Sequence, residues 1–313
     1  MARAGPLRTL RPLLPLAGLA LLAALAPWLA PYPPDAQLDI VGLRTQPPSW
    51  AHPFGTDAYG RDVLSRVLHG GRVSLAVSAL AVLVGMGVAT VVGVTAAATG
   101  GRVDRLVRRA LEVALAIPRL LVLVVVAGFF GPLPAATLVL VIGLSGWFDV
   151  ARLVADESTA LLGRDYVTAA RATGSGTPRL VRRHLLPHLV PLLTALAPVS
   201  LAATMAMEAG LGLLGLGIQP PQARWGTIMQ DGITAGPGAW WLTVFPGAAM
   251  LVVIVAAHVA GERMGAPSAG RLRDGVPVPQ VAGEPAPTGA PPDAHASAAP
   301  AGTAPVSPSS LAP

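Results

Sequence analysis

The residues that could do chemistry in this chain are few, and their spacing favours no reaction. The 313 residues include no Cys, and all 22 basic residues are Arg, which excludes thiol nucleophiles, Cys-based zinc sites and the lysine of a phosphate-binding loop. His184 and His188 are four residues apart, but we expect Pro187 to break the helix between them, so we interpret both as interfacial residues. No nucleophile elbow is present. We therefore predict no catalytic, metal or cofactor site.

Two acidic residues stand out by their positions. Glu208 lies inside a long apolar run, and acids inside membranes are costly and often line transport pathways or gates. The structural alternative is an acid near the outer headgroups that a neighbouring group satisfies. Asp57, in the sequence Gly-Thr-Asp, is expected to cap or turn a polar loop. A membrane-embedded enzyme would need several converging acids or histidines, and Glu208 is the single candidate, so we predict that the chain is not an enzyme.

Composition places these residues in a membrane protein. The chain is 53% hydrophobic and 12% charged, with a mean hydropathy of +0.60, whereas soluble chains carry about 25% charged residues. A net charge of +6 can indicate nucleic-acid binding, but the arginines lie at the ends of apolar runs, and aromatic residues make up only 4% of the chain, too few for base stacking. Arginine beside apolar runs instead indicates basic cytoplasmic loops of a protein embedded in a lipid bilayer.

Six apolar runs are long enough to be membrane spans. They cover residues 13–30, 73–98, 111–130, 135–154, 189–217 and 240–260. The first run follows a basic start and has two interpretations, a cleavable signal peptide or a retained span, and its length favours the retained span. Gly85, Gly87 and Gly93 in the second run are expected to let a neighbouring helix approach closely. Pro118 interrupts the third run.

Charge bias assigns the segments to sides of a bacterial cytoplasmic membrane, with both termini in the cytoplasm. The predicted divisions are a cytoplasmic N-terminus with the first span (1–31), an outer loop with a short amphipathic helix at 61–69 (32–72), a core of five spans (73–262) containing an inner loop (155–187), and a disordered cytoplasmic tail (263–313). The tail is rich in Pro, Ala, Gly and Ser and cannot bury enough apolar surface to fold. The Arg, Ala, Gly and Pro content is typical of a GC-rich bacterial genome.

The inner loop has the most informative pattern of the chain. We expect Asp165 to cap a helix over 166–173, Gly174 to end it, and Thr177 to cap a second helix that stops before Pro187. The result is a helix–turn–helix with one surface of small residues and one of arginines, which is typical of a docking element. An ordinary amphipathic loop resting on lipid headgroups fits the residues equally well, so the pattern alone leaves both interpretations open.

This loop resembles the EAA loop of permease subunits of bacterial ATP-binding-cassette (ABC) importers. That loop reads Glu-Ala-Ala, three residues, Gly, nine residues, then Ile-x-Leu-Pro. Here Thr168-Ala169-Ala170 precedes Gly174 by the same spacing, and His184-Leu185-Leu186-Pro187 follows nine residues later. Thr168 replaces the Glu and His184 replaces the Ile. Residues 53–75 and 208–226 resemble the second-type permeases for dipeptides, oligopeptides and nickel, and the similarity covers roughly 12–265.

The resemblance implies an all-α bundle of six transmembrane helices, as in type I ABC importers. It also implies a second homologous permease, an extracytoplasmic solute-binding protein, and ATPase subunits that bind the ATP, while this chain binds no cofactor and no nucleic acid. The implied coupling residues are Asp165, Tyr166, Thr168, Ala169, Ala170, Arg171, Gly174, Leu186 and Pro187. The family also allows Asp57 to help dock the binding protein. The expected cargo is a di- or oligopeptide.

Two alternatives remain open. One is an ABC importer permease for nickel or another small solute. The other is a membrane channel or scaffold that works without an ATPase, which would have no reason to keep the EAA spacing.

Overall fold

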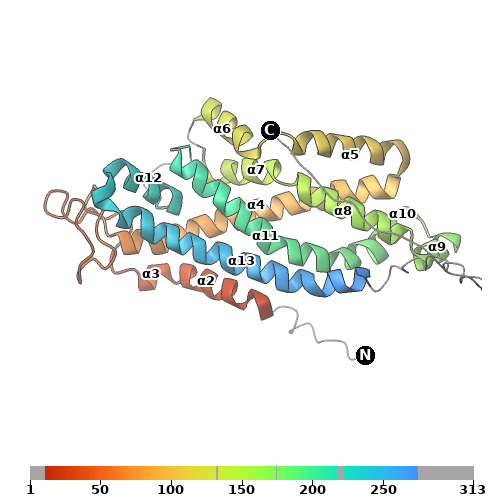
Figure 1. Ribbon diagram of the computed structural model, residues 1–313, viewed down its shortest axis with the longest axis horizontal. Coiled ribbons are helices and arrows are strands. Elements are labelled where there is room, and N and C mark those ends of the chain that lie inside the picture. The colour runs from red at the N-terminus through yellow and green to blue at the C-terminus, as the bar shows by residue number, and fades with distance from the viewer. Residues whose placement is uncertain (1–10, 132, 174, 217–221, 274–313) are drawn as a thin grey trace, which may run out of the picture. The chain divides into compact units, whose positions relative to one another are not determined.

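The computed structural model describes residues 11–131, 133–173, 175–216 and 222–273. Over these residues the chain consists of helices and loops, and its one extended pairing is an isolated bridge between Thr56 and Asp62. Figure 1 shows the long helices α4, α11 and α13 running alongside one another. The predicted all-α fold class is confirmed.

Each of the six predicted apolar runs contains helix, with non-helical residues inside the first, third and fourth runs and at the end of the fifth. Three helical segments are long and apolar enough to cross a bilayer without a break, Val63–Thr99, Thr177–Leu213 and Trp241–Gly265. Two pairs of shorter helices satisfy the same criteria if each bent pair counts as one span. The first run forms the 3-10 turn η1 (Arg11–Leu13), α2 (Leu14–Ala24) and α3 (Ala26–Leu29), and it is too short to meet these criteria, so the described helices give up to five of the six predicted spans. Large apolar side chains such as Phe129 and Leu83 face outward, as lipid contact requires.

Helix α4 (Val63–Thr99) begins ten residues before the predicted start of the second span. Its start is fixed by Asp62, whose carboxylate accepts a hydrogen bond of 2.8 Å from the Ser65 backbone N–H. The separate amphipathic helix predicted for 61–69 was therefore wrong, because that segment is the first part of α4. Gly70 and Gly71 do not break the helix, and a Cβ added at Gly71 would lie 2.8 Å from the Trp225 ring.

The third and fourth spans are bent pairs and not single straight helices. Helices α5 (Gly101–Leu115) and α6 (Arg119–Phe130) meet at 76°, and α7 (Ala135–Ser145) and α8 (Phe148–Leu162) meet at 47°. Pro118 explains the first break, because proline has no N–H to donate and disfavours helical geometry in the residue before it. The interruption at Pro118 was predicted, but helix α5 starts ten residues earlier than the predicted span.

The remaining elements correct three further expectations. Helices α9 (Asp165–Ala172) and α10 (Thr177–Leu180) are followed by the π-helical turn η2 (Val181–Leu185), α11 (Leu186–Leu213), α12 (Trp225–Ala235), η3 (Pro237–Ala239) and α13 (Trp241–Arg273). Pro187 does not interrupt the helix. As the second residue of α11, just after the wider π turn, it is tolerated in a continuous helical path. Helix α12 lies between the predicted fifth and sixth spans, outside every predicted helix, and α13 continues past residue 263.

Helix α4 packs closely against α7 and α8 through glycine. A Cβ added at Gly93 would lie 2.7 Å from the Ala151 carbonyl oxygen, and one at Gly85 would lie 3.0 Å from that of Gly143. The predicted close approach at these two positions is confirmed. It was wrong at Gly87, where a Cβ would meet nothing within 4 Å.

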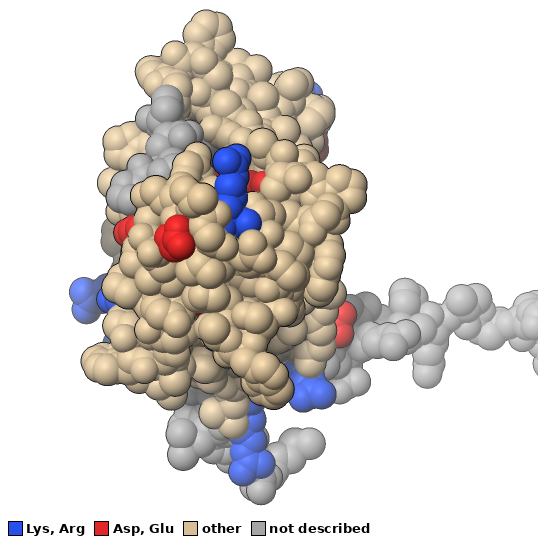
Figure 2. Space-filling model, turned by 90° about the vertical axis from the view of Figure 1, so that its left-hand side faces the viewer, with Lys and Arg blue, Asp and Glu red and all other residues tan. Residues whose placement is uncertain are grey.

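The described helices have two contrasting ends. We call the end with residues 31–62, α12 and Trp240 the aromatic end, and the end with α9, α10 and the start of α11 the basic end (Figure 1). Trp241 is buried at the aromatic end and donates from its ring to the Thr56 carbonyl at 3.1 Å, while Trp240 is half exposed. Figure 2 looks onto the aromatic end, where few charged side chains reach the surface.

Candidate functional site

The predicted coupling loop forms a distinct element at the basic end. Helix α9 is anchored by Val167 and α10 by Leu180, both buried, so that the intervening small residues stay at the surface. Thr168, Ala169 and Arg171 are exposed, and Ala170 is half-buried. Gly174 lies outside the described residues. The sequence therefore predicted α9, its exposed small surface and the start of a second helix at Thr177 correctly, but that second helix continues into α11 and does not stop before Pro187.

The caps of these helices differ from the prediction. Asp165 is the first residue of α9 and makes no capping hydrogen bond, and the residue before the helix is Arg164. Thr177 is likewise inside α10, which is preceded by Gly176. An acid in the first turn still interacts favourably with the helix dipole, so Asp165 stabilises α9 without capping it.

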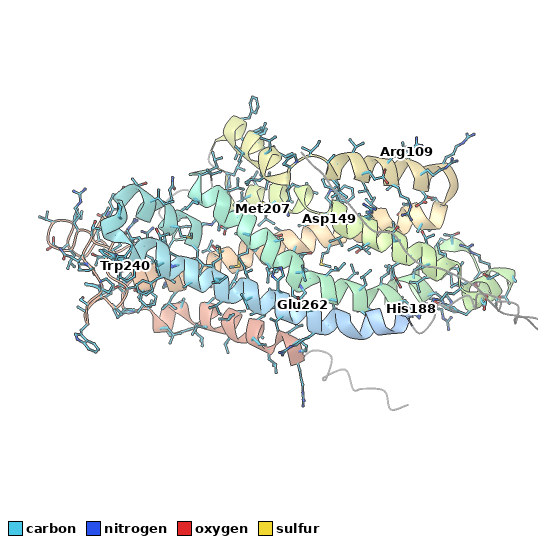
Figure 3. The ribbon with its side chains drawn as sticks, in the orientation of Figure 1. Arg109, Asp149, His188, Met207, Trp240 and Glu262 are labelled. Carbon is cyan, nitrogen blue, oxygen red and sulfur yellow. The ribbon has the colours of Figure 1, made fainter. Side chains whose placement is uncertain are left out.

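Tyr166 ties the coupling loop to the long helix that follows it. Its ring centroid lies 6.0 Å from that of His184 and 5.9 Å from that of His188, with the second pair nearly parallel. Because the helix is continuous through Pro187, the two histidines share one face and the His188 ring nitrogen lies 2.6 Å from the His184 carbonyl. Figure 3 labels His188 at this end of the molecule. A displacement of α9 would therefore be transmitted to α11.

The other surface of the loop is strongly basic. Arg179, Arg182 and Arg183 line a hollow of about 630 Å³ together with Pro178. None of these arginines forms an ion pair with a described residue. Unpaired charges grouped on an exposed element attract a partner of opposite charge. Leu186, 37% exposed, and Pro187 follow directly.

Asp57 lies at the opposite, aromatic end and is completely buried. Its carboxylate accepts a 2.6 Å hydrogen bond from Arg61 Nε and another from Arg66 Nη1. Arg66 also reaches Asp231 of α12 at 3.1 Å. Asp57 therefore turns the loop before α4 and holds it to α4 through Arg66, which links it to α12, and its carboxylate is not on the surface.

A polar cavity of about 900 Å³ adjoins this ion cluster. Its walls include side chains from the outer loop and from α12, among them Arg44, Tyr59, Arg61, Gln230 and Asp231. The Arg61 guanidinium carbon lies 4.6 Å from the centre of the Tyr59 ring. The aromatic end thus presents a hollow lined by groups of both charges.

Glu208 is buried near the aromatic end and forms an ion pair with Arg224, the residue before α12. Both side chains are 1% exposed. Burial lowers the pKa of Arg224 to about 10, so the guanidinium remains charged at neutral pH. Glu208 Oε2 and two Arg224 nitrogens have no hydrogen-bond partner among the described residues. The pair connects α11 to α12, which agrees with the structural interpretation of Glu208.

Sequence reasoning missed Arg224, Asp231 and Arg119. The first two lie in or beside α12, a helix outside the predicted spans. Arg119 interrupts an apolar run directly after Pro118, and that position was the available signal. Within the described residues, no three His, Asp or Glu side chains lie close enough together to hold a metal ion.

Comparison with known proteins gives a consistent result. Residues 89–264 match the family described as binding-protein-dependent transport system inner membrane component. The chain is 35% identical over 243 residues to the di/tripeptide transport system permease protein DppC of Pseudomonas aeruginosa (strain UCBPP-PA14), covering 76% of this chain and 79% of that protein. It is 33% identical over 239 residues to the dipeptide transport system permease protein DppC of Bacillus subtilis (strain 168), covering 76% and 74%.

A third similar protein is a putative peptide transport system permease protein of Brucella suis biovar 1 (strain 1330). The identity is 36% over 241 residues, which cover 76% of this chain and 79% of that protein.

Proposed function

Because this chain belongs to the family of binding-protein-dependent transport system inner membrane components, we propose that it is the permease subunit of an ATP-driven importer of di- and oligopeptides. The peptide cargo is supported by three relatives at 33–36% identity, whose names specify peptides, dipeptides or di/tripeptides. None of the three relatives named above has nickel in its name, so we favour a peptide permease over a nickel permease. The cargo crosses the membrane without chemical change, and this chain contributes no catalytic site.

The proposal assigns energy coupling to the basic end. One observation carries it: the segment with EAA spacing is an exposed helix, α9, whose Tyr166 packs on the long helical path Thr177–Leu213. That path has 37 residues and is therefore about 55 Å long. An ATPase that binds α9 would move a lever reaching to Glu208 near the aromatic end.

We assign one proposed partner to each end of the molecule. ATPase subunits, which bind the ATP, contact α9 and α10, so the basic end faces the cytoplasm. The solute-binding protein contacts the aromatic end on the outer side. A second homologous permease completes the pathway, and both termini lie in the cytoplasm. Asp57 supports the docking surface from inside by fixing the outer loop.

Ala170→Asp tests the coupling assignment. The substitution places an unpaired charge on the half-buried small surface of α9, and we expect at least about a tenfold loss of ATPase binding, which corresponds to roughly 1.4 kcal/mol. Copurification of the ATPase with the permease measures the loss of binding. Peptide uptake into membrane vesicles measures the loss of transport. Ala160→Asp, on an exposed position of α8, is the matched control for an added charge.

Normal insertion with loss of both ATPase binding and uptake supports the proposal. Uptake at the wild-type rate with the ATPase still bound would favour the channel or scaffold alternative. An equal loss in the Ala160 control would show that the added charge itself, and not its place on α9, causes the defect.

A further inference from the structure

A cavity of about 710 Å³ lies where the two bent helix pairs break. Its walls come from the end of α5, the start of α6, the end of α7 and the start of α8. We call it the broken-helix cavity, and its lining includes Leu115, Arg119, Val122, Ser145, Phe148 and Asp149. Four half-helices thus end at one place. Interrupted helices in transporters commonly surround a substrate or ion site.

The cavity lies between the two ends of the described bundle. Arg119 also borders a small hollow shared with Gly85 of α4, and the stretch from Gly85 to Thr99 at the basic end of α4 is about 21 Å long. Figure 3 labels Asp149 well away from both His188 and Trp240. Neither the coupling loop nor the aromatic-end cavity includes these residues.

Two opposite charges interrupt the otherwise mainly apolar lining. Arg119 donates from Nη2 to the Ile142 carbonyl at 2.7 Å and from Nε to Ser145 Oγ at 3.2 Å. These bonds hold the guanidinium at the end of α7, beside Gly146 in the break, and its Nη1 has no hydrogen-bond partner among the described residues. Asp149 is exposed and forms neither a hydrogen bond nor an ion pair with any described side chain.

This arrangement fits a small zwitterion. Ligand sites are typically cavities of about 300–1,000 Å³ with apolar walls and a few polar groups that orient the ligand. Arginine is suited to a carboxylate because its planar fork can donate two parallel hydrogen bonds. A carboxylate such as Asp149 pairs with an ammonium group. Charged residues at membrane depth are energetically costly and often bind a substrate or an ion.

We propose that the broken-helix cavity binds a short peptide during transport, with its free carboxylate at Arg119 and its free amino group at Asp149. The proposal rests on the proposed function and specifies where this chain touches the cargo. It implies recognition of the two peptide ends, which all unmodified peptides share, while the apolar walls accept varied side chains. An acyl chain of a lipid and a helix of the partner permease are the competing occupants.

Protection of a single cysteine tests the site in the assembled transporter. The chain has no native cysteine, so Val122→Cys, in the cavity wall and 38% exposed in the wild type, gives one labelling position on this subunit. A free dipeptide should slow its reaction with a small thiol reagent. Its C-terminal amide and its N-acetyl form should each need about tenfold higher concentration for equal protection. Trp50→Cys, fully exposed at the aromatic end, is the unprotected control.

Second substitutions assign each end of the peptide. With Arg119→Gln, the free dipeptide and its amide should protect equally, while Arg119→Lys should keep a preference for the free carboxylate. With Asp149→Asn, the free dipeptide and its N-acetyl form should protect equally. Each result is the ratio of the protecting concentrations of two peptides on the same variant. A general loss of stability would affect both peptides equally and would leave this ratio unchanged.

Absence of protection by the free dipeptide, or equal protection by all three peptides on the wild-type background, would overturn the proposal. A thiol at position 122 that does not react in the assembled transporter would also overturn it, because lipid or the partner permease would then fill the cavity. Dipeptide uptake by the same vesicles distinguishes failure of the cavity proposal from failure of the proposed function. Uptake without protection rejects this site alone, and loss of ATP-dependent uptake from the wild-type complex rejects the proposed function.

Discussion

The two ends of this protein treat charge in opposite ways. At the aromatic end, Arg61 and Arg66 neutralise Asp57 and Asp231 in an ion cluster, and Glu208 pairs with Arg224. At the basic end, Arg179, Arg182 and Arg183 are exposed and have no acidic partner among the described residues. The first arrangement pairs its charges within one chain, whereas the second leaves its charges without a partner among the described residues. Paired charges at the aromatic end hold the bundle together, and exposed arginines at the basic end are available to bind an acidic partner.

The largest effect should come from breaking the buried ion pair at the aromatic end. Arg224→Met leaves the Glu208 carboxylate buried without its partner, and we expect a loss of about 3–5 kcal/mol in the free energy of unfolding. Thermal unfolding of the purified permease in detergent measures it. Adding Glu208→Leu should restore most of the stability, because the double variant has no uncompensated buried charge. Wild-type stability of the single variant would contradict this role.

The glycines of α4 give the next largest effect, together with a matched control. Gly93→Ala places a methyl group against the Ala151 carbonyl and should destabilise the permease by about 1–3 kcal/mol. Gly87→Ala meets open space and should stabilise α4 slightly, by about 0.5–1 kcal/mol, because alanine favours helix. The same unfolding measurement compares them, and equal effects would show that α4 does not pack on α8 as described.

Charge reversal at the basic end should affect assembly more than folding. Replacing Arg179, Arg182 and Arg183 together by Glu should weaken ATPase binding by about tenfold or more, because the attraction to an acidic partner becomes repulsion. Unfolding of the isolated permease should change little, since these side chains form no ion pair with a described residue. ATPase binding titrated at two salt concentrations measures the effect. Unchanged binding would place the partner elsewhere.

Thr168→Ala should have the smallest effect. Thr168 is exposed, and its hydroxyl makes one long hydrogen bond, 3.4 Å to the Arg164 carbonyl. Surface changes of this kind alter stability by about 0.5 kcal/mol or less. ATPase copurification should also stay near the wild-type level, because the family's glutamate is already missing at this position. A loss as large as that of Ala170→Asp would assign Thr168 a direct contact.

Apolar periodicity and the loop spacing predicted most of the fold. The spans around Gly85 and Gly93 and the two short helices at 165–180 could be read from local signals, because apolar length and helix formers act within a few turns. Local signals did not indicate the length of α4, the continuity of the helix through Pro187 or the existence of α12. Each depends on packing between distant segments, as where Trp225 donates to the Val67 carbonyl.

The candidate sites divide in the same way. The exposed surface of α9 follows from sequence because it depends on one short segment. The direct partners of Asp57 and Glu208 lie four to sixteen residues away, but Arg66, which binds Asp57, also meets Asp231 over 165 positions of sequence. No local pattern indicates such a pair. Arg119 was visible as an arginine in an apolar run, but its relation to Asp149 required the broken helices to be brought together.

Cross-linking from α9 tests the central claim most directly. A single cysteine at Ala169, carrying a short photo-activated cross-linker, should join this chain to the ATPase in assembled membranes. The same probe at Gln222, at the aromatic end, should join it to the solute-binding protein and not to the ATPase. If the probe at Ala169 fails to reach the ATPase while the probe at Gln222 does reach it, the basic end is not the coupling end and the account is wrong.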